Sequence, residues 1–233
     1  MPTLVLLLTA AALSTAGHIV SRSGLALGRA HYFLKPLAIA LIICVAASAA
    51  DSSAYAALIV AGLAASAVGD VLLMWSATLF LPGLLAFLAA HLLYSAAFAG
   101  AWIEAFGAFR GTWMAPHATG PLIAFTAGAA ALAGMAIYRR LRPGIAQGQR
   151  PFVVAYTFAI MTMAALATLA AASAWSPPAA AAMAGAWLFV ASDIALAMDR
   201  FVGSFSKPPL RETAVALPYF SGQALIACSV VLA

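Results

Sequence analysis

The sequence is poor in charge. Asp, Glu, Lys and Arg make up only 7% of its 233 residues, whereas soluble domains carry about 25%. With 11 basic and 6 acidic side chains, the chain cannot cover the surface of a soluble globule of this length. This scarcity excludes a cytosolic enzyme, a nucleic-acid-binding protein and a disordered chain. It leaves a protein that crosses a membrane several times.

Cysteine is scarce as well. Cys44 and Cys228 both lie in apolar runs, where cysteine behaves as a small hydrophobic residue. The sequence has neither a glycine-rich phosphate loop nor a Gly-x-Ser-x-Gly motif. His18, His31 and His117 stand at the ends of apolar runs or between them rather than in a cluster. We therefore expect neither a metal ion nor a cofactor.

Apolar sequence, in contrast, is abundant. The chain is 66% hydrophobic, with a mean hydropathy of +1.06. A membrane-spanning helix needs about 20 apolar residues. We predict an all-α bundle of eight transmembrane helices that forms a single domain over residues 1–233, with the first helix retained rather than cleaved. The predicted spans cover residues 3–20, 35–50, 55–74, 79–102, 119–138, 152–172, 179–198 and 212–232.

The basic residues are distributed unevenly. With eight spans, every Lys and Arg except Arg110 falls on one side of the membrane. The positive-inside rule assigns that side to the cytoplasm and both termini to the opposite side. We expect a multi-pass protein of the bacterial inner membrane. The net charge of +5 is thus a topology signal, and the basic loop from Arg139 to Arg150 is expected to meet anionic lipid headgroups.

Two aspartates lie inside predicted spans. Asp70 stands in the segment AVGDVLLMW and Asp193 in the segment FVASDIALAMDRF. A carboxylate at membrane depth is costly and rarely faces lipid, so each aspartate is a candidate functional group. The alternative is that each only accepts a hydrogen bond that ties helices together.

Other polar side chains share this depth. His91 and Tyr94 fall on one helix face, as do Tyr219 and Gln223, because residues three or four apart are neighbours on a helix. Taken singly, a Tyr or Lys near a span end usually anchors the helix at the membrane interface. However, all of them fall in the cytoplasmic half, and the outer halves of the same spans are apolar. The pattern predicts a polar pocket that opens toward the cytoplasm, with His91 and Gln223 at its bottom. The further polar residues of this half are Lys35, His91, Tyr94, Tyr156, Tyr219 and Gln223.

The order and spacing of these motifs resemble the YhhN family of integral membrane proteins, the lysoplasmalogenases. The resemblance implies an eight-helix membrane hydrolase that cleaves the vinyl-ether bond of lysoplasmalogens. The products are a fatty aldehyde and glycerophosphoethanolamine or glycerophosphocholine. The resemblance covers residues 29–229. The motifs that show it are Lys35-Pro36-Leu37, Gly69-Asp70, Phe87 with His91-x-x-Tyr94, Tyr156, Phe189 with Ser192-Asp193 and Phe201, and Tyr219 with Gln223.

Hydrolysis of a vinyl ether needs a proton delivered to carbon and a water that captures the resulting oxocarbenium ion. One protonated acid and one ionised carboxylate suit this chemistry, as in glycoside hydrolysis. Our hypothesis is that Asp70 and Asp193 share these two roles, in an order left open, and that His91 relays a proton or positions water. The remaining residues are assigned to binding: Tyr94, Tyr156, Tyr219 and Gln223 to orienting the pair or the glycerol, and Lys35 to the substrate phosphate.

Two other functions stay open. Intramembrane Asp and His residues also form proton relays, so a proton-coupled transporter of a small molecule or lipid is the main alternative. A transporter needs access from both faces, whereas the polar residues here stop near the midplane. The third possibility is a lipid-binding or assembly protein without catalysis. The expected partners are a lysophospholipid and membrane lipids, with no nucleic acid, and the oligomeric state stays open.

Overall fold

The computed structural model describes residues 2–24, 27–50, 52–75, 77–109 and 116–233. Arg110, the exception in the charge pattern, lies outside them. In the described residues, eight helices are long and apolar enough to cross a membrane, so the prediction of an all-α, multi-pass membrane protein is confirmed. The long helices are α1 (Pro2–Arg22), α2 (His31–Ala49), α3 (Ala54–Trp75), α4 (Phe80–Phe109), α5 (Pro116–Leu141), α6 (Arg150–Ser173), α7 (Pro177–Val202) and α8 (Pro208–Val231), and the short 3₁₀ turns are η1 (Ala77–Leu79), η2 (Arg142–Gly144) and η3 (Gln147–Gln149).

Most of the helices extend beyond the predicted spans. Hydropathy marks only the part of a helix that lies in hydrocarbon, whereas the helix itself continues through the polar headgroup region. The last turn of α5, for example, carries Arg139 and Arg140. The helix α8 begins at Pro208, because proline fits the first turn, where its missing N–H would have no helical partner.

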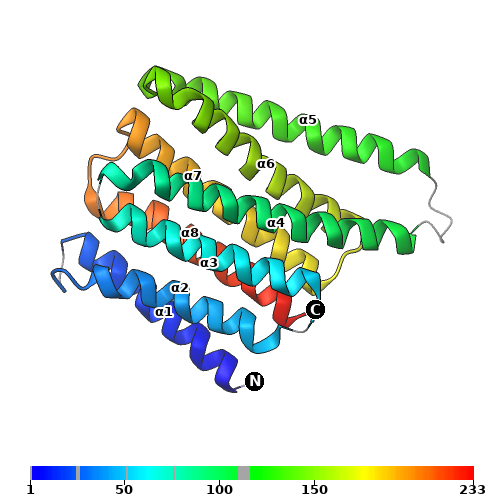
Figure 1. Cartoon of the computed structure of the whole chain (residues 1–233), viewed down its shortest axis with the longest axis horizontal. Helices are drawn as coiled ribbons and strands as arrows, with labels where there is room; N and C mark the ends of the chain where they lie inside the picture. Colours follow the sequence, from blue (N-terminus) through cyan, green and yellow to red (C-terminus); the bar gives the residue numbers. More distant parts are fainter. Residues whose placement is uncertain (1, 25–26, 51, 76, 110–115) are drawn as a thin grey trace.

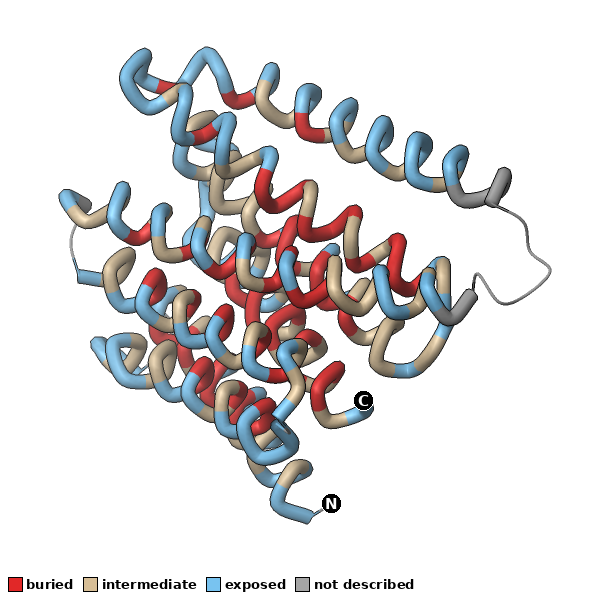
Figure 2. The backbone as a smooth tube through the Cα atoms, turned by 45° about the vertical axis from the view of Figure 1, so that its right-hand side comes forward, coloured by how far each residue is buried: buried red, intermediate tan, exposed pale blue. Residues whose placement is uncertain are grey.

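The helices run roughly alongside one another (Figure 1). The tightest pairs are α7 with α8 and α3 with α4, and α4 also packs on α6. The helices α1 and α2 pack on each other and on α8. Buried residues gather in the middle of the bundle, while α5 lies at one edge and is mostly exposed (Figure 2). The polar residues of the candidate site come from the central helices and from α2.

Glycines allow a close contact between α7 and α8. A Cβ atom added at Gly185 would lie 2.7 Å from the carbonyl oxygen of Gly222, and one added at Gly222 would lie 2.8 Å from that of Gly185. Small residues of this kind let two backbones approach each other in a membrane protein. The contact fixes α7, which carries Asp193, against α8, which carries Tyr219.

Candidate active site

Asp70 is held by partners from two other helices. It lies near the end of α3 and is 1% exposed. The Nζ atom of Lys35 on α2 lies 2.7 Å from its Oδ1 atom, and the hydroxyl of Tyr219 on α8 donates a 2.8 Å hydrogen bond to its Oδ2 atom. A charge this deeply buried is tolerated only when it is paired and hydrogen-bonded. The Asp70 carboxylate and the Lys35 ammonium form such a pair.

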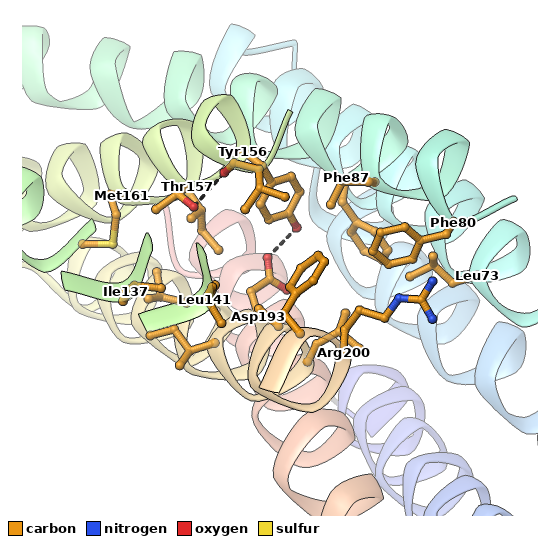
Figure 3. Close-up of a pocket in the computed structure, with 18 residues that line it drawn as sticks. Leu73, Phe80, Phe87, Ile137, Leu141, Tyr156, Thr157, Met161, Asp193 and Arg200 are labelled. Atoms are coloured by element: carbon orange, nitrogen blue, oxygen red, sulfur yellow. Dashed lines mark hydrogen bonds between the residues drawn. The ribbon is translucent and has the colours of Figure 1, made fainter. Parts of the chain in front are cut away.

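Asp193 on α7 has a different set of partners. Tyr156 on α6 donates a 2.5 Å hydrogen bond to its Oδ2 atom (Figure 3). The Nε2 atom of His91 on α4 lies 3.3 Å from the same oxygen and 2.9 Å from the Tyr156 hydroxyl. Because the Tyr156 proton is directed at Asp193, we assign the hydrogen of the neutral imidazole to Nε2, from which it can be donated to either oxygen. Both contacts meet the same oxygen atom, Oδ2.

A third polar pair lies deeper in the bundle. The hydroxyl of Tyr94 on α4 donates a 2.7 Å hydrogen bond to Oε1 of Gln223 on α8, and both residues are fully buried. This bond joins two helices that carry other site residues. Neither Tyr94 nor Gln223 lines the two cavities described next.

A polar cavity of about 190 Å³ contains both aspartates. Its wall comes from α1, α2, α3, α4, α7 and α8. In addition to Lys35, Asp70, Asp193 and Tyr219, several ionisable side chains that the sequence analysis did not assign to a site line it: His18, Arg22, His31, Arg211 and Glu212. Arg22 and Arg211 are each 39% exposed and pair with acidic groups, Arg22 with Glu212 at 3.4 Å and Arg211 with Asp199 at 2.6 Å.

Figure 3 shows the lining of an apolar cavity of about 70 Å³. This cavity adjoins the polar one. The two share Leu73, Phe87, Asp193 and Leu196 as lining residues. The rest of the apolar cavity is formed mainly by aliphatic and aromatic side chains of α4, α5, α6 and α7. The side chain of Asp193, which is 13% exposed, therefore stands at the boundary between a polar and an apolar space.

The structure brings the predicted site residues together in three groups: Lys35, Asp70 and Tyr219; His91, Tyr156 and Asp193; and Tyr94 with Gln223. Two details differ from expectation. The ammonium of Lys35 faces Asp70, although the sequence suggested a substrate phosphate. His91 and Gln223, expected at the bottom of the pocket, are fully buried behind the cavity wall. Aromatic residues pack against His91; the ring centre of Phe189, for example, lies 4.8 Å from that of His91.

The missed residues are those at the mouth of the polar cavity. Arg22 and Arg211 stand at predicted span ends, where a basic residue is expected for topology alone, so nothing in the sequence distinguished them. Among the described residues, no group of three or more His, Cys, Asp or Glu side chains is arranged to hold a metal ion.

Comparison with known proteins identifies the family. The sequence model of the YhhN family matches residues 30–230. The chain belongs to the YhhN family. It is also 31% identical over 177 residues to lysoplasmalogenase TMEM86A of Bos taurus. The aligned segment covers 73% of this chain and 63% of that protein. The chain thus spans less than two thirds of the length of this curated relative. No solved structure matches the chain.

The two aspartates of this YhhN-family protein differ in their surroundings. Asp70 has a lysine within ion-pair distance. The basic side chain that contacts Asp193 in the described residues is His91, which is charged only when protonated. Both line one cavity, so a bound molecule can contact both. Two carboxyl groups that reach one bound molecule have the composition that general acid–base chemistry requires.

Proposed function

We propose that this protein is a lysoplasmalogenase, which hydrolyses the vinyl-ether bond of a lysoplasmalogen to a fatty aldehyde and a glycerophospho-alcohol. The observation that carries the proposal is the position of Asp193, where the polar and apolar cavities meet. A lysoplasmalogen changes from polar to apolar at its vinyl ether. With the headgroup in the polar cavity and the first carbons of the chain in the apolar one, the reacting bond would lie beside Asp193.

The two carboxyl groups take different roles in this mechanism. Asp70 is the ionised member, since Lys35 balances its charge at 2.7 Å. Asp193 is the acid. Because Tyr156 and His91 both contact Oδ2, the transferable proton would be carried by Oδ1. The reaction needs one ionised carboxylate and one protonated acid, and the ion pair with Lys35 assigns the ionised role to Asp70.

The reaction begins with proton transfer. The O–H bond of Asp193 breaks and a C–H bond forms at the vinyl carbon remote from the ether oxygen. The electron pair of the double bond makes that new bond, and an oxocarbenium ion results. Water then adds to the carbon next to the oxygen and gives its proton to Asp70. The hemiacetal then breaks its bond to the glycerol oxygen, which takes the proton from Asp70, while the hemiacetal hydroxyl gives its proton to Asp193. The aldehyde is released, and both carboxyl groups return to their starting states. Acid–base assistance of this kind contributes roughly 10²–10⁴-fold to the rate.

The headgroup would bind at the mouth of the polar cavity. Arg22 and Arg211 line this mouth and are half exposed, and guanidinium groups bind phosphate through two parallel hydrogen bonds. Lys35 then balances the charge of Asp70 and does not bind the phosphate. By the positive-inside rule the mouth opens toward the cytoplasm, as expected for a protein of the bacterial inner membrane.

The direct test is product analysis with detergent-purified protein. It is incubated with a 1-alkenyl, a 1-alkyl and a 1-acyl lysophospholipid that share one headgroup. We expect aldehyde from the alkenyl lipid, and neither alcohol nor fatty acid from the other two. Absence of aldehyde from folded protein would contradict the proposal. Uptake of labelled lipid into proteoliposomes without aldehyde release would favour the transporter.

A further inference from the structure

The helix α5 leaves a long apolar groove against α6. This groove has a volume of about 480 Å³ and is lined by residues of α5 between Ala127 and Tyr138 and of α6 between Val154 and Leu169. Among the residues of α5 whose burial is described, only Gly134 and Leu141 are buried. The groove thus runs along the membrane-facing side of the bundle, parallel to the helices.

This groove adjoins the apolar cavity beside Asp193. Thr157 and Met161 of α6 line both spaces. Gly134 of α5 lies directly over them: a Cβ atom added there would be 3.4 Å from Cγ of Met161 and 3.5 Å from Cγ2 of Thr157. A side chain larger than alanine at residue 134 would press on both residues, which form the junction between the two spaces.

The inner end of α5 is fixed, unlike the rest of the helix. Leu141, Ile145 and Val153 form a small buried cluster that packs against the end of α7. A Cβ atom at Gly144 would overlap the carbonyl group of Phe201, so the η2 turn lies tightly on α7. Beyond this anchor, α5 packs mainly on α6. The side chains that contact the two aspartates come from α2, α4, α6 and α8 rather than from α5.

We propose that the α5–α6 groove holds the hydrocarbon chain of the lysolipid and is the lateral path by which this chain enters from the membrane. The inference rests on the proposed function. The apolar cavity of about 70 Å³ holds only the carbons nearest the vinyl ether. The α6 wall of the groove from Thr157 to Leu169 extends the apolar path by about 18 Å, at 1.5 Å per helical residue. Polar cavity, Asp193, apolar cavity and groove follow one another in the order of headgroup, vinyl ether and chain.

Photo-crosslinking tests the location without requiring hydrolysis. The probe is a 1-O-hexadecyl lysophosphatidylethanolamine with a diazirine at the end of its chain. Its ether bond lacks the double bond that is cleaved. We expect labelled peptides from α5 residues 127–138 and α6 residues 154–169, and loss of labelling with excess unlabelled alkyl lysolipid. Labelling elsewhere, or labelling that the competitor does not reduce because any membrane lipid fills the groove, would overturn the inference.

A matched pair of variants tests the same path by activity. Gly134→Leu fills the junction, whereas Gly128→Leu, also on α5, meets open space. We expect Gly134→Leu to lower kcat/KM for a hexadecenyl lysoplasmalogen by about tenfold and to leave an octenyl one within about twofold. Equal losses for both chains in a folded variant would overturn the inference. If wild-type protein releases no aldehyde but the labelling pattern holds, the proposed function fails and the groove stands.

Discussion

The Nζ atom of Lys35 lies 2.7 Å from Oδ1 of Asp70, a side chain that is 1% exposed. This contact joins α2 to α3 and gives the two aspartates unequal surroundings. One carboxylate carries a balanced charge. The other, Asp193, lies between a tyrosine and a histidine at the edge of an apolar space. The proposed division into base and acid follows from this asymmetry.

The ion pair predicts a coupled effect on stability. Lys35→Met leaves a buried negative charge without its partner and should cost about 3–5 kcal/mol. Asp70→Asn combined with Lys35→Met removes both charges and should recover most of that loss, although it remains inactive. Thermal unfolding of the wild-type protein and both variants in detergent measures this. A double variant as unstable as Lys35→Met would show that the pair does not act as a unit.

The effect of replacing each site tyrosine should depend on the residue to which its hydroxyl donates. Tyr156→Phe and Tyr219→Phe remove the hydroxyls that contact Asp193 and Asp70 and should lower kcat at least tenfold, about 1.4 kcal/mol in activation free energy. Tyr94→Phe leaves the buried Gln223 oxygen without its donor and should cost about 1–3 kcal/mol of stability with little change in kcat. Steady-state kinetics and thermal unfolding of the three Phe variants distinguish a loss of kcat from a loss of stability. A large kcat loss in stable Tyr94→Phe would extend the site to that residue.

The arginines at the cavity mouth predict a binding effect. Arg211→Ala should raise KM for the lysolipid by about tenfold and leave kcat within about twofold, because it removes a contact made equally in ground and transition states. Arg140→Ala on α5 is the matched control, since Arg140 does not line the polar cavity. A fall in kcat at unchanged KM would assign Arg211 to the chemistry instead.

Helix packing around the site depends on two glycines. A methyl group at Gly185 would lie 2.7 Å from the carbonyl oxygen of Gly222, so Gly185→Ala should separate α7 from α8 and reduce both stability and activity. Gly100→Ala on α4 is the control, because its methyl group meets nothing within 4 Å. It should be neutral or stabilise by up to about 1 kcal/mol. Equal behaviour of the two variants in unfolding assays would contradict the packing account.

The sequence predicted the architecture well, since long apolar runs and the sidedness of Lys and Arg depend on local composition alone. It also predicted that Asp70 and Asp193 belong to one polar pocket, and both line one cavity, because depth follows from position along a helix. It could not predict which side chains pair. Tyr219 lies 149 residues from Asp70 and His91 lies 102 residues from Asp193, and such contacts depend on how the helices pack.

The role of Lys35 shows the same limit. A lysine at a span end is equally suited to a lipid phosphate, a substrate phosphate or a buried carboxylate, and only the packing of α2 against α3 and α8 selects Asp70. The apolar cavity and the α5–α6 groove could not be predicted from the sequence either. Their walls are mostly ordinary aliphatic and aromatic residues, which look the same in sequence whether they face a neighbouring helix or an open space.

The most direct measurement is aldehyde release from a lysoplasmalogen at saturating concentration by wild-type protein and three aspartate variants. Asp199→Asn is the control. Asp199 lies on α7 like Asp193, but it forms an ion pair with Arg211 and has no part in the proposed proton transfer. The account predicts aldehyde from wild type and Asp199→Asn, and none from folded Asp70→Asn or Asp193→Asn. Release at the wild-type rate by either of the last two would contradict it.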